Sequence, residues 1–310
     1  MKKWILKAIV QKTISYLPFG NKVNYLFQKY ITKGVYLTDE YFYDRLGHAK
    51  AHIEAFATYS PKKKPDSCLE LGTGWYPIVP ISFYLIGVSQ IYSIDISFLT
   101  SKERIKTTIE QFIAAHDAGK LAQYLPFLPE KYASLLKLYQ QYEALSLEEI
   151  LKQLQLTYLI EDARKSSLAN DSIDLVNSNN TFEHIYPEIL MPILADFKRV
   201  VNKKQGVMSH FIDMSDHFAH FDKSINIYNF LQFSETQWQR IDNSIQPQSR
   251  LRIDDYQAMY ESLKLPITYQ TYREGNLAGL KTVTLAEMYA KKPLETVAIS
   301  HCHFVSDMRV

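Results

Sequence analysis

The stretch Cys68–Trp75, Cys-Leu-Glu-Leu-Gly-Thr-Gly-Trp, constrains the fold more than any other part of this 310-residue chain. Its apolar first half suits a strand that is buried on both faces. Gly72 and Gly74 then allow a tight turn and a close approach of the backbone to a ligand. Pro77 and Pro80 suit the first turn of a helix, where a missing N–H costs little. The stretch therefore predicts a strand, a turn and a helix in succession.

A second apolar run, Ile91–Ile96, predicts a neighbouring strand with Asp95 near its carboxyl end. In an open parallel sheet, nucleotides bind outside the carboxyl ends of the strands. A carboxylate at such an end can accept both hydroxyls of a ribose. The two runs together predict an α/β protein with a doubly wound sheet and a site for a nucleotide-like ligand.

The residues of the turn distinguish a dinucleotide-binding site from a site for a nucleotide-like ligand without phosphates. A dinucleotide fingerprint needs a third glycine, but Tyr76 would stand in its place, and Glu70 would repel a pyrophosphate. The sequence Glu70-Leu-Gly-Thr-Gly74 instead resembles the first motif of class I S-adenosylmethionine (SAM)-dependent methyltransferases. SAM has a positive sulfonium and no phosphate, so an acidic residue beside the turn is favourable. A nicotinamide enzyme ranks behind this interpretation, and a turn without a ligand ranks last.

The resemblance covers roughly residues 66–305 and implies a Rossmann-like, seven-stranded, doubly wound sheet that binds SAM. The further strands expected are Thr157–Ile160, Ile173–Val176 and Gly206–Asp213, followed by a terminal antiparallel hairpin from Ile267–Tyr272 and Thr296–Val305. It also implies that Glu70, Gly72, Thr73 and Gly74 hold the methionine end of SAM, Asp95 the ribose, and Asp162 and Ala163 the adenine, while Asn179 lies near the methyl group.

Two helical additions to the sheet are expected. Residues 1–60 have helical periodicity and predict an amino-terminal cap in front of a methyltransferase domain at 61–310. The interval of about 100–155 between the second and third strands is too long for an ordinary crossover. It contains several helical patterns, so we expect a helical insertion there, which could form a lid over the acceptor pocket.

Histidines are the candidates for the chemistry. Methyl transfer from a sulfonium is an in-line displacement, so the protein must align the acceptor and, for a hydroxyl, remove a proton. Histidine is the natural base near neutral pH. We rank His217 first, then His184 and then His220. If residues 215–222 are helical, His217 and His220 share a face. For each one, a hydrogen-bonded structural histidine is the alternative.

A metal site is a second interpretation of the same segment. Five residues there are of metal-ligand type and could form a mixed nitrogen and oxygen site for a divalent ion: Asp213, Asp216, His217, His220 and Asp222. Their spacing matches no defined metal signature. The sequence alone therefore leads us to assign no metal, and the question of an ion at Asp213–Asp222 stays open.

Charge and cysteine content narrow the partners and the location. The chain has 35 Lys and Arg against 33 Asp and Glu, a formal charge of +2, which argues against a nucleic-acid partner. Its two cysteines form no disulfide framework, so we expect a cytoplasmic protein. The amino-terminal run Met1–Val10 is too short and too charged to span a membrane. We expect an amphipathic helix that packs on the body, and a peripheral membrane contact stays open.

The acceptor class is narrowed by the end of the fourth strand. Methyltransferases that act on amide or exocyclic amino nitrogens often carry two prolines there, whereas this chain has Asn179-Asn-Thr-Phe182. We therefore expect a small-molecule or peptidic acceptor with a hydroxyl, carboxyl or amine group, and we expect the aromatic stretch Phe218–Trp238 to form a wall of its pocket. The alternatives are a non-catalytic SAM-binding protein of the same fold and then an NAD-dependent oxidoreductase.

Overall fold

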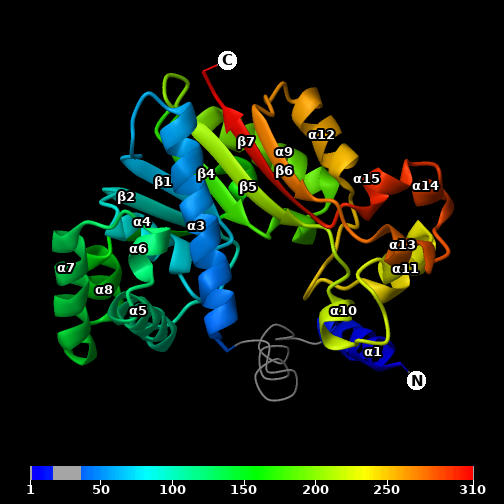
Figure 1. Ribbon diagram of the computed structural model, residues 1–310, viewed down its shortest axis with the longest axis horizontal. Helices are drawn as coiled ribbons and strands as arrows, with labels where there is room; N and C mark the ends of the chain where they lie inside the picture. Colours follow the sequence, from blue (N-terminus) through cyan, green and yellow to red (C-terminus); the bar gives the residue numbers. More distant parts are fainter. Residues whose placement is uncertain (1, 17–35, 310) are drawn as a thin grey trace.

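The computed structural model describes residues 2–16 and 36–309, and its centre is a seven-stranded sheet (Figure 1). The strand order is β3-β2-β1-β4-β5-β7-β6. The first five strands are parallel, and β7 runs antiparallel to both of its neighbours. Their bounds are β1 Ser67–Leu71, β2 Gln90–Asp95, β3 Leu156–Ile160, β4 Leu175–Asn179, β5 Val207–Asp213, β6 Tyr269–Arg273 and β7 His301–Asp307. The predicted doubly wound sheet with a terminal antiparallel pair is confirmed.

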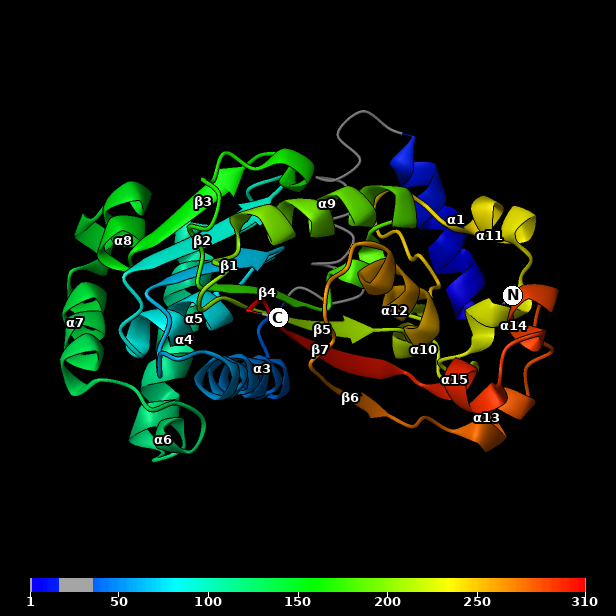
Figure 2. The same ribbon diagram turned by 90° about the horizontal axis from the view of Figure 1, so that it is seen from above.

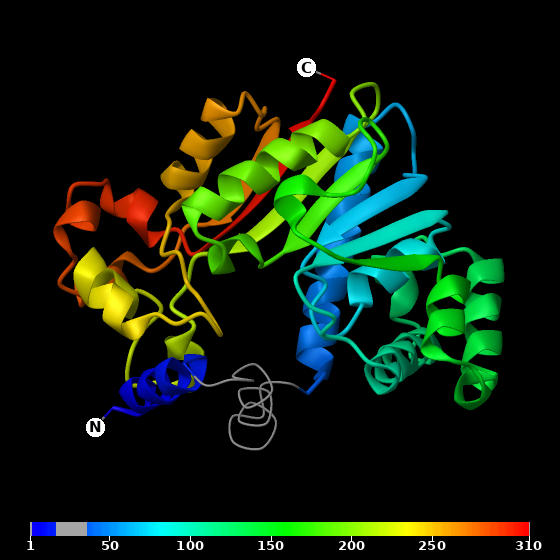
Figure 3. The same ribbon diagram turned by 180° about the vertical axis from the view of Figure 1, so that it is seen from behind.

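Helices cover both faces of the sheet (Figures 2 and 3). On one face lie α3 (Asp39–Tyr59) and α4 (Ile78–Leu85), and on the other lie α9 (Pro187–Val200) and α12 (Ile253–Ser262). Because of this double cover, every residue of β1 is buried. The strand order changes direction between β1 and β4, and in open sheets a ligand binds at the carboxyl ends beside such a point.

Two local features explain why α3 and α9 begin where they do. The Thr38 side chain accepts a hydrogen bond from the Tyr41 backbone N–H and so caps α3. Pro187 is the first residue of α9, and a proline disfavours helical geometry in the residue before it. The segment after β4 therefore does not form one continuous helix: the chain forms a short 3₁₀ helix, η4 (Phe182–His184), and α9 begins at Pro187.

The fourth strand lies further along the chain than its apolar residues predicted. The expected strand was Ile173–Val176, but β4 covers Leu175–Asn179, and Ile173 makes only an isolated bridge to Val201. Asn177 and Ser178 are fully buried within β4 despite being polar. A strand between β1 and β5 is covered on both faces whatever its side chains are, so hydrophobicity underestimates its carboxyl end.

The interval between β2 and β3 is helical, as expected. It contains α5 (Lys102–Asp117), α6 (Leu121–Tyr124), α7 (Pro129–Gln140), the 3₁₀ helix η2 (Tyr142–Ala144) and α8 (Leu147–Gln153). These helices lie beside β3, whereas α10 (Phe218–Phe221), which follows β5, lies away from them (Figure 2). The expectation that the insertion forms a lid over the acceptor pocket stays a prediction. The insertion approaches the glycine turn where the Arg104 guanidinium lies 4.4 Å from the Trp75 ring centroid.

The amino-terminal helix α1 (Lys3–Ser15) packs against α10 and against α11 (Glu235–Ile241), segments distant from it in sequence (Figure 1). Trp4, Phe218, Phe230 and Trp238 are all buried in the hydrophobic core that this contact creates. The aromatic stretch expected to line a pocket is core instead, because α1 covers it.

The remaining short elements are η3 (Ala163–Lys165), η5 (Asn229–Gln232), α13 (Leu277–Lys281), α14 (Glu287–Ala290) and α15 (Leu294–Ala298). Of the predicted cap, residues 17–35 lie outside the described residues, and the domain boundary at residue 60 stays a prediction. No helix among the described residues combines the length and the apolar content needed to cross a lipid bilayer.

Candidate functional site

The glycine turn after β1 has the conformation expected of a ligand loop. Gly72 and Gly74 have φ angles of +70° and +71°, a region that residues with a side chain rarely adopt. A Cβ atom on Gly72 would lie 2.7 Å from Cγ2 of Thr181. The turn is therefore restricted to glycine at position 72 by both conformation and space.

Glu70 is a buried carboxyl beside this turn. It is 3% exposed, and it accepts a hydrogen bond from Asn179 Nδ2 (2.8 Å) and another from the Thr73 hydroxyl. Burial raises the pKa of Glu70 to about 7, although these two hydrogen bonds oppose the shift. The structure thus brings together three of the predicted cofactor residues, Glu70, Thr73 and Asn179.

A buried chain of hydrogen bonds holds Asn179 from the other side. Its Oδ1 lies 3.0 Å from His52 Nε2, His52 Nδ1 lies 2.7 Å from Ser209 Oγ, and Ser209 Oγ lies 2.7 Å from His303 Nε2. One assignment of protons satisfies every atom: each group, from His303 through Ser209, His52 and Asn179, donates to the next, and Glu70 is the last acceptor. We call these five residues the Glu70 relay.

The predicted ribose and adenine residues lie at the ends of β2 and β3. Asp95 is partly buried, which raises its pKa, and its carboxylate accepts a long hydrogen bond of 3.3 Å from the Ser97 N–H. Asp162 caps η3 and pairs with the Arg164 guanidinium at 2.6 Å, so its carboxylate already has partners. Ala163 is buried. Asp95 has capacity for ligand hydroxyls, whereas Asp162 would have to exchange Arg164 for an adenine.

The structure also brings together the three histidines chosen from the sequence. His184 ends η4 after β4, and His217 and His220 follow β5 at the start and within α10. The ring centroids of His184 and His217 are 4.9 Å apart, and those of His217 and His220 are 5.6 Å apart. Because β4 and β5 are adjacent and parallel, the segments after them meet at one edge of the sheet.

Two carboxyl groups lie beside these histidines. Asp213 Oδ2 is 3.4 Å from His217 Nε2, and Asp213 Oδ1 is 3.3 Å from His301 Nε2. Burial alone would raise the pKa of Asp213, but the neighbouring His217, His301 and Ser215 hold it below its usual range. Glu183 precedes His184 and is 4% exposed, and its pKa is raised well above the usual range by burial and by Asp213.

The segment Pro247–Ser249 fixes this arrangement from outside. His184 Nδ1 donates to the Pro247 carbonyl (2.7 Å), and the His217 N–H donates to Gln248 Oε1 (3.2 Å). The Ser249 N–H donates to the Glu183 carbonyl (2.8 Å). One short segment therefore positions Glu183, His184 and His217 together.

The residues of the possible metal segment divide into two groups. Asp213, His217 and His220 each offer a ligand atom within 4.8 Å of the others. Asp216 instead accepts hydrogen bonds from Asn229 Nδ2 (3.1 Å) and the Phe218 N–H (2.8 Å), and Asp222 accepts one from the Trp4 N–H (3.0 Å). The last two carboxylates hold the fold, so the segment does not form a single ion site.

Sequence reasoning missed Glu183, His52 and His303. Glu183 lies next to a chosen histidine and directly after β4, a position that signals the site edge in this fold. His48 and His52 are four residues apart on α3 and so share one of its faces, which was a signal for a polar contact with the sheet. Nothing local marked the pairing of His303 with Ser209, 94 residues away in the sequence.

A scan of protein-family models and a search of curated proteins found no match to this sequence. Several solved structures are similar in fold. One is Burkholderia thailandensis 1,6-didemethyltoxoflavin-N1-methyltransferase with bound 1,6-didemethyltoxoflavin and S-adenosylhomocysteine. It is 10% identical, with a TM-score of 0.46 over 92% of this chain and 85% of that one.

Two others were solved with SAM. Haemonchus contortus phosphoethanolamine N-methyltransferase 2 is 12% identical, with a TM-score of 0.43 over 90% of this chain and 58% of that one. A geranyl diphosphate methyltransferase is 11% identical, with a TM-score of 0.41 over 88% of this chain and 92% of that one. With TM-scores below 0.5 and identities of 10–12%, these similarities carry no conclusion about this chain. The fold is identified from the sheet, because it has the seven strands and the antiparallel β7 that the resemblance implied. The chain has a class I methyltransferase fold.

Proposed function

We propose that this protein is a SAM-dependent methyltransferase that acts on a hydroxyl, carboxyl or amine of a small-molecule or peptidic acceptor. The observation that carries the proposal is the juxtaposition of two groups at the carboxyl edge of the sheet. A buried acidic residue beside a positive-φ glycine turn lies at the end of β1, and three histidines lie at the ends of the nearby strands β4 and β5.

The residues around the turn fit SAM by their chemistry. Gly72 and Gly74 both have positive φ angles, which form a tight turn whose backbone can approach a ligand closely. Glu70 provides a negative charge for the amino group and the sulfonium, and Asp95 can accept ribose hydroxyls. Asp162 and Ala163 are assigned to the adenine. When bound, SAM supplies an electrophilic methyl group.

At the acceptor side, His217 is the candidate base. Its pairing with Asp213 orients the ring and would stabilise the imidazolium that forms when a proton is taken up. His184 and His220 lie close to it, with ring centroids 4.9 Å and 5.6 Å from that of His217. A protein that only bound SAM would have no need of three histidines at this edge, which favours transfer over binding alone.

Calorimetric titration with SAM and with S-adenosylhomocysteine tests the proposal. The wild-type chain should bind both, and Asp95→Ala should weaken binding by about 1–3 kcal/mol, the cost of leaving buried hydroxyls unpaired. Asp117→Ala, which changes an exposed carboxylate on α5, is the matched control and should bind normally. Absence of binding to the wild-type chain would overturn the function, and unchanged affinity in Asp95→Ala would overturn the ribose assignment.

A further inference from the structure

The carboxyl group of Glu183 is the buried acidic group beside the histidines whose oxygens have the fewest hydrogen-bond partners. Within residues 2–16 and 36–309, neither of its oxygens accepts a hydrogen bond of ordinary geometry. The backbone N–H groups of Glu183 and Asp213 and the guanidinium of Arg45 favour its ionised form, but burial outweighs them. Asp213 adds a second negative charge nearby. Buried carboxylates are normally paired or bind a metal, so this one calls for a positively charged partner.

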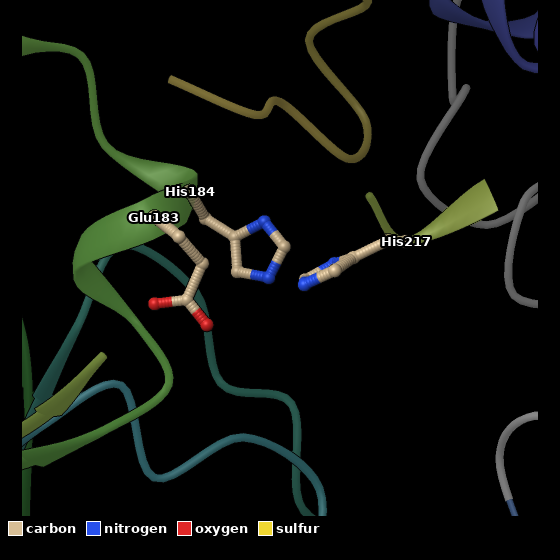
Figure 4. Close-up of side chains that lie close together, drawn as sticks. All are labelled: Glu183, His184 and His217. Atoms are coloured by element: carbon tan, nitrogen blue, oxygen red, sulfur yellow. The ribbon is translucent and has the colours of Figure 1, made fainter. Parts of the chain in front are cut away.

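The two neighbouring imidazoles can share such a partner with it. Figure 4 shows the carboxylate of Glu183 and the ring of His184, both on η4, approaching the ring of His217 from the same side. His184 Nδ1 donates to the Pro247 carbonyl, which leaves the lone pair of Nε2 available. Metal-binding histidines in proteins are commonly oriented by a hydrogen bond of this kind to a backbone carbonyl.

The ligand atoms of the three residues are also close enough to one another to bind a single ion. One ligand atom from each of Glu183, His184 and His217 lies within 4.8 Å of the other two. With metal–ligand bonds of about 2.0–2.2 Å, two ligand atoms on one ion are at most about 4.4 Å apart. Small changes of side-chain torsion are therefore enough, and the segment Pro247–Ser249 already holds the three residues in register.

We propose that Glu183, His184 and His217 bind a divalent first-row transition-metal ion. Two imidazoles and one carboxylate suit ions such as Zn²⁺, Mn²⁺ or Fe²⁺, whereas Mg²⁺ prefers oxygen ligands alone. Glu183 and Asp213 together balance the double positive charge. Binding of the ion does not depend on the proposed methyl transfer. An ion here would lie among the candidate catalytic histidines, where it could hold an acceptor oxygen, and it would use the lone pair that makes His217 a base.

The test is calorimetric titration of the chelator-stripped, full-length chain with Zn²⁺, Mn²⁺ and Mg²⁺ in a non-coordinating buffer. We expect one Zn²⁺ or Mn²⁺ per chain and much weaker binding of Mg²⁺. Glu183→Gln and His184→Ala should each weaken binding at least about tenfold. His220→Ala should change it little, and His116→Ala, on α5 and remote from the cluster, should not change it.

Circular dichroism and thermal unfolding check that each variant folds. Glu183→Gln has the same shape as the wild type and lacks the unpaired charge, so it should fold, yet lose the increase in Tm that Zn²⁺ or Mn²⁺ gives the wild type. Failure of the wild-type chain to bind either ion would overturn the proposal. Binding that survives Glu183→Gln but is lost in His220→Ala would overturn it as well, because the ion would then use Asp213, His217 and His220.

Discussion

The candidate site has a buried carboxyl group at each end, Glu70 and Glu183, and the two differ in their hydrogen-bond partners. Glu70 is the last acceptor of a relay in which every link is a hydrogen bond, with distances of 2.7–3.0 Å from His303 to Asn179 and of 2.8 Å from Asn179 to Glu70. Glu183 is buried to a similar degree, but no described residue donates a hydrogen bond of normal geometry to either of its oxygens.

This difference shows where the protein supplies hydrogen-bond partners for its own buried polar groups and where it does not. A satisfied polar network inside a protein fixes one conformation and resists change. An unpaired buried charge costs stability and persists where a ligand compensates for it. We infer that the Glu70 relay supports the cofactor loop rigidly. The site formed by Glu183, His184 and His217 is completed only when an ion binds.

The largest expected effect comes from breaking the relay at its centre. Asn179→Ala removes the donor to Glu70 Oε1 and the acceptor of His52 Nε2, and it leaves these two buried atoms without partners, although Glu70 keeps the Thr73 hydroxyl and His52 keeps Ser209. We expect a loss of about 3–5 kcal/mol in the free energy of unfolding, together with loss of SAM binding. Urea unfolding and calorimetry measure the two effects. Asn170→Ala, which removes an exposed hydrogen bond from Arg199, is the control and should cost less than about 1 kcal/mol.

The next effect concerns the turn that the relay supports. Gly72→Ala places a methyl group against Thr181 at a φ of +70°, so we expect a loss of about 2–3 kcal/mol in unfolding free energy and weaker SAM binding. Gly47→Ala, in the middle of α3 with open space around it, should be neutral or slightly stabilising. Adding Thr181→Ala to Gly72→Ala removes the clash. If the double variant recovers nothing, the space argument is wrong and only conformation matters.

A smaller expected effect is the pH dependence of SAM binding, which tests the role of Glu70. The pKa of Glu70 in the folded protein is about 7, and a cationic ligand favours the ionised form. Affinity for SAM should therefore rise about eightfold between pH 6.0 and pH 7.5 as Glu70 ionises, while most of the ligand's amino group keeps its proton. Glu70→Gln should bind more weakly and with little dependence on pH. The same dependence in both proteins would show that another group is responsible.

Without the cofactor, the sign of the Glu70 effect reverses. The folded-state pKa is raised above the ordinary value of 4.5, so between these two values the folded protein holds more protons than the unfolded chain. The contribution of Glu70 to stability is thus present below about pH 4.5, falls as the pH rises and is lost above about pH 7. Comparing unfolding of the wild type with Glu70→Gln at pH 5 and pH 8 isolates this component.

How much of this could be read from the sequence depends on how local each feature is. The strand, glycine turn and Asp95 were predictable because neighbouring residues determine them. The grouping of His184 with His217 follows from the adjacency of β4 and β5 that the fold implies. Phe218 and Trp238 were misjudged, because nothing near them in the sequence reveals that α1 covers them.

The Glu70 relay and the state of Glu183 could not be predicted for the same physical reason. His52 and Asn179 are 127 residues apart, and which buried polar group meets which is decided by the packing of α3 on the sheet. Whether Glu183 has a donor depends equally on the segment Pro247–Ser249, which supplies partners to His184 and His217 but none to this carboxylate. Sequence patterns identify the edge of the sheet where such groups gather, and only packing decides which of them remain unpaired.

The smallest expected effect comes from replacing each of the two buried carboxyl groups, Glu183 and Glu70, by the isosteric amide of glutamine. In protein without added metal, Glu183→Gln replaces a buried carboxyl group whose ionisation is opposed by burial and by Asp213 but which ionises in the unfolded chain at pH 6, so we expect the unfolding free energy at pH 6 to rise by about 1 kcal/mol. Glu70→Gln at the same pH also replaces a carboxyl group with a raised pKa, but it disturbs the hydrogen bonds from Asn179 and Thr73, so the two effects oppose each other and stability should change by less than about 0.5 kcal/mol. Urea unfolding of both variants in the presence of a chelator measures the difference. If Glu183→Gln is instead destabilising, the carboxylate has a partner within the protein, and the contrast between the two ends of the site does not hold.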